Sequence, residues 1–99
     1  MEYGYRAMFV LLHYYYRVLH LTTLRQIISR YAPENENNTN AYIRHVSDAI
    51  FKGADVPIAL DDRDEMVMIV AAMSRIENGI PANLDEVVAG WELYRKDRN

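Results

Sequence analysis

Cysteine is absent from the 99 residues of this chain. Its absence excludes a scaffold held by disulfides and a metal site built from thiolates. The three histidines do not have the HExxH spacing of zinc hydrolases. The sequence also contains no glycine-rich phosphate loop and no GxSxG nucleophile pattern. We therefore expect no metal and no cofactor.

Long apolar runs and an excess of positive charge are lacking as well. The apolar stretch near the start of the chain, Ala7–Leu12, is short, whereas a bilayer crossing needs ~20 residues. No cationic leader segment precedes it, so we expect no membrane association and a protein that is cytoplasmic as synthesised. Eleven basic against 14 acidic side chains give a net charge of −3. This balance argues against binding nucleic acid by phosphate neutralisation.

What the sequence does contain is helical periodicity, in five segments, with no sustained strand alternation. The hydrophobic fraction of 51% is typical of a globular domain. We expect helices over Tyr3–Leu19, from Thr22 or Thr23 to Ala32, over Asn40–Phe51, from an Asp61 cap to Gly79, and from Asn83 to Tyr94. Thr39 is expected to cap the third helix, and Gly53 to take the left-handed conformation after it. The sequence thus predicts an all-α, compact bundle of about five helices in a single domain, residues 1–99.

The apolar stripes of these segments predict the core. The inward-facing residues are expected to be Tyr5, Met8, Phe9, Leu12, Tyr16, Leu19, Leu24, Ile27, Ile28, Tyr31, Tyr42, Ile43, Val46, Ala49, Ile50, Met66, Ile69, Val70, Met73, Ile76, Leu84, Val87, Val88, Trp91 and Tyr94. Gly90 either weakens the fifth helix or marks a close helix contact. Tyr14, Tyr15 and Tyr16 point about 100° apart on a helix, so at least one faces solvent or an interface.

The most polar stretch lies between the second and third helices. Its asparagines and Thr39 fit a turn and a helix cap. The same stretch also fits a polar site in which Arg30, Glu36 and Asn38 present hydrogen-bonding groups to a sugar, a peptide or a protein. The sequence is compatible with both interpretations.

Glu77 lies at the margin of the apolar stripe of the fourth helix. A carboxylate there either forms an ion pair, with Arg30 or Arg6 as partner, or acts as the general acid of a glycosidase. In the second case Glu36 is the candidate second carboxylate.

Four segments carry a resemblance to a known family. They are Tyr3–Ala7, Leu21–Pro33, Glu36–Ile43 and Ile76–Gly79, in which an arginine–aromatic–Ala-Pro loop continues into Glu-Asn-(Asn/Asp)-Thr. Over nearly its whole length the chain resembles a family of small phage and prophage proteins, usually labelled virion or structural proteins, of which some are suspected to be lysozyme-like. Family members often carry an upstream Asn-Pro-x-Asn-Ile-Arg segment, which this sequence does not show.

The resemblance and the residues together lead to two hypotheses. The first is a non-enzymatic, virion-associated protein that binds a protein partner or itself through Arg30, Tyr31, Glu36, Asn38 and Tyr42. Tyr14–Tyr16 would form a second contact patch. The alternative is a lysozyme-like muramidase or transglycosylase, truncated or degenerate, that is directed at peptidoglycan. There Glu77 is the acid and Arg30, Glu36 and Asn38 bind substrate.

Overall fold

The computed structural model describes residues 2–33 and 36–98, without the side chains of Glu36, Asn37 and Arg98. It contains the helices α1 (Glu2–Arg17), α2 (Leu24–Tyr31), α3 (Glu36–Ile50), α4 (Arg63–Asn78) and α5 (Leu84–Arg98). In these two ranges β-pairing is limited to one isolated bridge between Thr23 and Pro57. The predicted all-α bundle of five helices is therefore confirmed.

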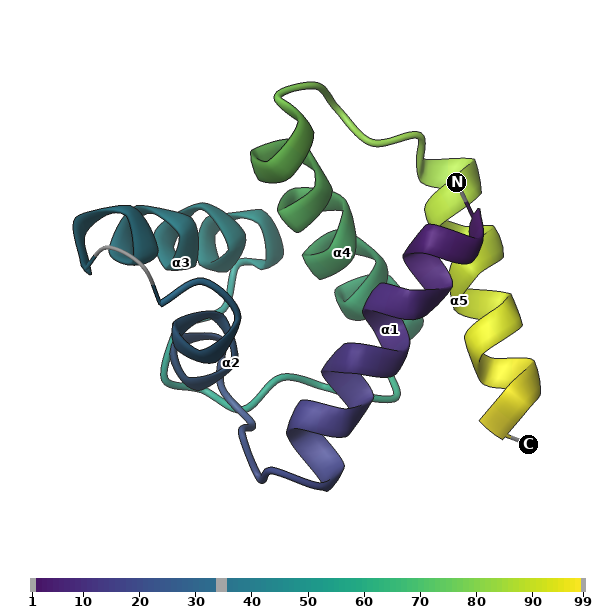
Figure 1. The fold of residues 1–99 in the computed structure, drawn as a ribbon, viewed down its shortest axis with the longest axis horizontal. Helices are drawn as coiled ribbons and strands as arrows, with labels where there is room; N and C mark the ends of the chain where they lie inside the picture. Colours follow the sequence, from purple (N-terminus) through teal and green to yellow (C-terminus); the bar gives the residue numbers. More distant parts are fainter. Residues whose placement is uncertain (1, 34–35, 99) are drawn as a thin grey trace.

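Helix α4 lies between the α2–α3 pair and α5, and α1 crosses in front of it (Figure 1). Its central place explains its composition, because residues on most of its circumference are buried. They are Met66, Val67, Ile69, Val70, Ala71, Ala72 and Met73. Among the helices that the structure describes, none is long and apolar enough to cross a membrane.

Helices α1 and α5 approach each other closely at Gly90. A Cβ atom built on Gly90 would lie 2.7 Å from Cβ of Tyr5 and 2.8 Å from the carbonyl oxygen of Glu2. The glycine lets the two backbones meet, so the close-contact interpretation of Gly90 is correct. Beyond it the ring of Phe9 packs edge-on against Trp91, with centroids 5.3 Å apart.

The segment between α3 and α4 also contributes to the core. Ile58 and Leu60 are buried, and the Ile58 amide donates to the carbonyl of Thr22 at 2.8 Å. Lys52 and Glu65 span the ends of this segment with an ion pair of 2.9 Å. The ion pair fixes where the segment leaves α3 and enters α4.

The start of α3 differs from the prediction. The helix begins at Glu36, and Thr39 lies inside it instead of capping it. The Thr39 hydroxyl donates to the carbonyl oxygen of Ala32, at the end of α2. A polar run without glycine or proline can form the first turn of a helix when it faces solvent, and an acidic residue there suits the positive end of the helix dipole. The prediction was therefore wrong to place the start of this helix at Asn40, after a polar turn.

The end of α3 also differs. Phe51, rather than Gly53, takes the left-handed conformation, with φ of 53°. The Lys52 amide donates to the carbonyl of Ser47 at 3.2 Å, and the Phe51 amide to that of Asp48 at 3.3 Å. This pair of bonds is a Schellman motif. The phenylalanine occupies the position that glycine usually takes, and its side chain is 97% exposed.

Two smaller predictions need correction. Asp62, not Asp61, caps α4, since its side chain accepts from the Glu65 amide at 3.0 Å. Asp61 instead accepts from Arg95 at 2.8 Å. Leu84 was expected in the core but is 50% exposed at the first position of α5, whereas Val87, one turn further along, is buried.

In the tyrosine triplet, Tyr15 is buried and Tyr14 is exposed. Tyr16, which was expected to face the core, is only partly buried and packs at its edge. The stripe of α1 therefore follows Tyr5, Phe9, Leu12 and Tyr15. Tyr14 is left as the exposed member of the proposed second patch.

Candidate functional site

The hydroxyl of Tyr42 and the carboxylate of Glu77 join α3 to α4. Tyr42 donates to Oε1 of Glu77 at 3.1 Å. The tyrosine is only 8% exposed, whereas the last turn of α4 leaves Glu77 exposed. A buried donor thus holds a carboxylate that faces solvent. The arrangement limits the rotamers that the glutamate side chain can adopt.

The pKa values of the two tyrosines at this junction, Tyr31 and Tyr42, are both raised. Burial is the main cause that raises the pKa of Tyr42 far above its ordinary value, followed by the charge of Glu77 and the hydrogen bond to it. Burial, then the Glu77 charge, also raises the pKa of Tyr31. The rings of Tyr31 and Tyr42 lie edge to face, with centroids 6.3 Å apart. Both phenols therefore remain protonated donors at neutral pH.

A polar pocket of about 290 Å³ opens beside these rings. Its lining comes from the end of α2, the first turns of α3 and the end of α4: Tyr31, Ala32, Asn38, Thr39, Tyr42, Ile76 and Glu77. Of the residues predicted to form a site, the structure thus brings together Tyr31, Asn38, Tyr42 and Glu77. Arg30 is exposed on α2 and is not part of this lining. Glu36 begins α3, but its side chain lies outside the described part of the chain.

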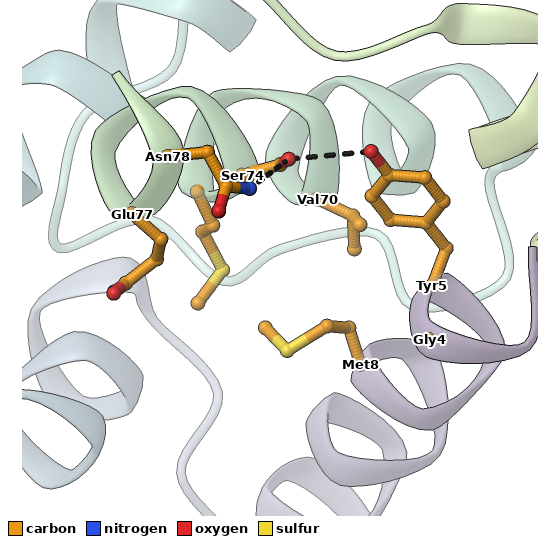
Figure 2. Close-up of a pocket in the computed structure, with 8 residues that line it drawn as sticks. Gly4, Tyr5, Met8, Val70, Ser74, Glu77 and Asn78 are labelled. Carbon is orange, nitrogen blue, oxygen red and sulfur yellow. Dashed lines mark hydrogen bonds between the residues drawn. The ribbon is translucent and has the colours of Figure 1, made fainter. Parts of the chain in front are cut away.

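A second, apolar pocket of about 180 Å³ lies between α1 and α4. It is lined by Gly4, Tyr5, Met8, Val70, Met73, Ser74, Glu77 and Asn78. Figure 2 shows Glu77 at one end of this pocket and Tyr5 at the other, with Met8 below α4. Oγ of Ser74 lies 3.3 Å from the Tyr5 hydroxyl and accepts from Nδ2 of Asn78 at 3.2 Å. Hydrogen bonds thus connect Tyr5, Ser74 and Asn78 along one edge of the pocket, whose floor is apolar.

Glu77 lines both pockets, so the two form one composite surface around its carboxylate. Neither arginine that was considered as its ion-pair partner takes that role in the described ranges. Arg6 is bound to Asp97 at 2.6 Å, and the hydrogen-bond partner of Glu77 is the phenol of Tyr42. Glu77 is the carboxylate among the described lining residues, and no second one accompanies it there.

The apolar pocket was not anticipated from the sequence. Tyr5 and Met8 were assigned to the core, and Ser74 and Asn78 were not considered. One signal was available, because Val70, Ser74 and Asn78 follow each other at steps of four and therefore share a face of α4. Two polar residues continuing an apolar stripe mark the place where that stripe reaches the surface.

In residues 2–33 and 36–98, no three His, Asp or Glu side chains lie close enough together to hold a metal ion. His13 instead places Nδ1 2.8 Å from the hydroxyl of Tyr94. Comparison of the chain with protein-family models, with curated proteins and with solved structures gives no match. The composite surface around Glu77 is therefore the candidate site of this chain.

Proposed function

We propose that this chain is a helical protein of phage or prophage origin that acts through contact with another protein, centred on the Glu77 carboxylate. The observation that carries the proposal is the bond between a buried Tyr42 and an exposed Glu77 that lines two pockets. An acceptor whose rotamer is already fixed loses less side-chain entropy when a partner binds. Such pre-orientation favours recognition.

The composition of the surface supports a protein as partner. Tyrosine is enriched at protein interfaces, and Tyr31 and Tyr42 both line the polar pocket. The adjoining pocket supplies apolar area next to these hydrogen-bonding groups. Phage origin is supported by the resemblance of residues 29–33 and 36–43, segments that contribute much of the polar pocket lining.

The test uses a charge reversal at the centre of the surface. We expect the chain to form a complex, either with a second copy or with a purified protein encoded beside it, in sedimentation velocity over a series up to millimolar concentration. Glu77→Arg should weaken that complex by about tenfold, or ~1.4 kcal/mol. Glu92→Arg, on an exposed position of α5, changes the net charge equally and should leave the complex intact.

Two results would overturn this proposal. One is the absence of any complex with itself and with every protein encoded beside it. The other is a complex that the two charge reversals weaken equally, because that result reports net charge and not a surface at Glu77.

One observation favours a second function, hydrolysis of peptidoglycan. Glu77 is exposed beside a pocket, where a general acid could reach a bound glycan. Glycosidases commonly use two carboxylates, and Glu77 lacks a second one among the described lining residues. A high concentration of the unmutated protein that releases no muropeptides from purified cell walls would remove this candidate. Release that Glu77→Gln abolishes would establish it.

A further inference from the structure

The apolar pocket beside Glu77 has the chemistry of a receptor for an amine on an aliphatic stem. We propose that it receives a lysine side chain of the protein partner. This inference rests on the proposed function and deepens it, because it names the residue with which the partner anchors itself. The pocket would hold the stem of the lysine on its floor and the ammonium group at its rim.

The floor of the pocket fits the stem. Met8, Val70 and Met73 supply flexible and branched aliphatic surface. A protein cavity of ~150 Å³ accommodates a benzene molecule, so about 180 Å³ is sufficient for the four carbons of a lysine stem. Methionine side chains adapt to such an occupant, because they are unbranched and polarizable.

The rim of the pocket fits the ammonium group. Asn78 uses its Nδ2 to donate to Ser74, and its amide oxygen lies on the pocket side (Figure 2). With the Glu77 carboxylate it forms a set of acceptors at the last turn of α4. The C-terminal end of a helix carries partial negative charge and attracts cations. An ammonium group offers three donors to such a set.

The basic residues nearby do not oppose a cation. The described residues that line the pocket include no lysine, arginine or histidine. Arg6 follows Tyr5 on α1 but is bound to Asp97. Arg75 lines a different groove, which α3, α4 and the segment before α5 form. The electrostatic balance at the pocket is therefore negative.

The experiment observes the pocket directly through methionine methyl groups. The chain contains five methionines, of which Met8 and Met73 line the pocket while Met68 lies at the other groove. The probe is Nα-acetyl-lysine methylamide. The control ligand is Nα-acetyl-norleucine methylamide, which has the same four-carbon stem without the ammonium group. Methyl-labelled protein is titrated with each, and resonances are assigned with Met→Leu variants.

We expect the lysine probe to shift the Met8 and Met73 signals, and to bind about fivefold more tightly than the norleucine probe, as one well-placed exposed ion pair allows. Glu77→Gln keeps an acceptor for Tyr42 and should abolish that preference. Glu92→Gln should retain it.

The inference is overturned if neither probe binds, if the norleucine probe binds equally well, if the shifts follow Met68, or if Glu77→Gln keeps the preference. The proposed function fails separately. A lysine preference at Glu77 without any protein complex would retain the pocket as an amine site and exclude its role in protein contact. A complex centred on Glu77 without lysine preference would retain the contact and exclude the lysine anchor.

Discussion

Tyr42, a buried residue of α3, donates its hydroxyl to the exposed Glu77 carboxylate of α4 at 3.1 Å. The pair links packing to recognition, because the same bond that joins two helices also orients the charged group of the candidate site. Its energy and its effects on pH dependence can be measured.

Removal of the Tyr42 hydroxyl should weaken the fold. Tyr42→Phe is expected to lower the free energy of unfolding by about 1.5 kcal/mol, the typical value for a hydrogen bond to a charged acceptor. Urea unfolding measures the change. Tyr14→Phe is the matched control, since Tyr14 is 45% exposed, and it should change stability by less than about 0.5 kcal/mol. Equal effects of the two variants would contradict a stabilising role of the bond.

High pH should unfold the protein in a manner that depends on Tyr42. Burial and the Glu77 charge raise its pKa above the ordinary value of 10.0. The folded chain therefore keeps a proton that the unfolded chain releases, so this contribution to stability is complete below about pH 10 and is lost as the pH rises further. Unfolding followed against pH by circular dichroism, with tyrosinate absorbance alongside, measures the slope. Tyr42→Phe should flatten it, and an unchanged slope would contradict the assignment.

Alanine substitutions at Gly4 and Gly90, which both lie in helices, should change stability in opposite directions. Helix propensity by itself predicts that alanine stabilises both. At Gly90 a methyl group would lie within 3 Å of Tyr5 Cβ and of α1 backbone atoms, so Gly90→Ala should destabilise the fold by about 1–3 kcal/mol. A methyl group at Gly4 would meet no other part of the chain within 4 Å, and Gly4→Ala should stabilise by about 0.5 kcal/mol. Thermal unfolding compares them, and stabilisation by both would refute the close α1–α5 contact.

Glycine at Phe51 should stabilise the chain. A non-glycine residue in the left-handed region costs roughly 1–2 kcal/mol, and the 97% exposed side chain loses little packing when it is removed. Phe51→Gly is therefore expected to raise the unfolding free energy by about 1 kcal/mol relative to Phe51→Ala, which keeps the strain. Denaturant midpoints of the two variants provide the test. A lower midpoint for the glycine variant would refute the strain at this position.

The sequence predicted the helices because their apolar residues recur with helical spacing, as in Met66, Ile69, Val70 and Met73 of α4. The prediction erred at helix ends, where neighbouring residues of the same type can each cap the helix. Asp61 and Asp62 are equally good caps by type, and the choice depends on the contact of Asp61 with Arg95 of α5. Residues such as Phe51 take unusual conformations because flanking hydrogen bonds hold them, and composition does not reveal that.

The candidate site was predicted in part for a related reason. Tyr31, Asn38, Tyr42 and Glu77 were identified as polar or aromatic residues near helix ends, and the fold brings them to one pocket. The apolar half was missed, because its residues also look like ordinary core residues until the crossing of α1 over α4 leaves a space between them. That crossing depends on contacts distant in sequence.

The pairing of α1 with α5 bears on the order of assembly during synthesis. Residues 5–13 find their partners in residues 90–97, through Gly90, Trp91, Tyr94 and Asp97. On the ribosome, α1 therefore emerges long before α5, and Phe9 lacks its contacts with Trp91 and Tyr94 in the interval. Completion of the bundle awaits the release of α5 from the exit tunnel.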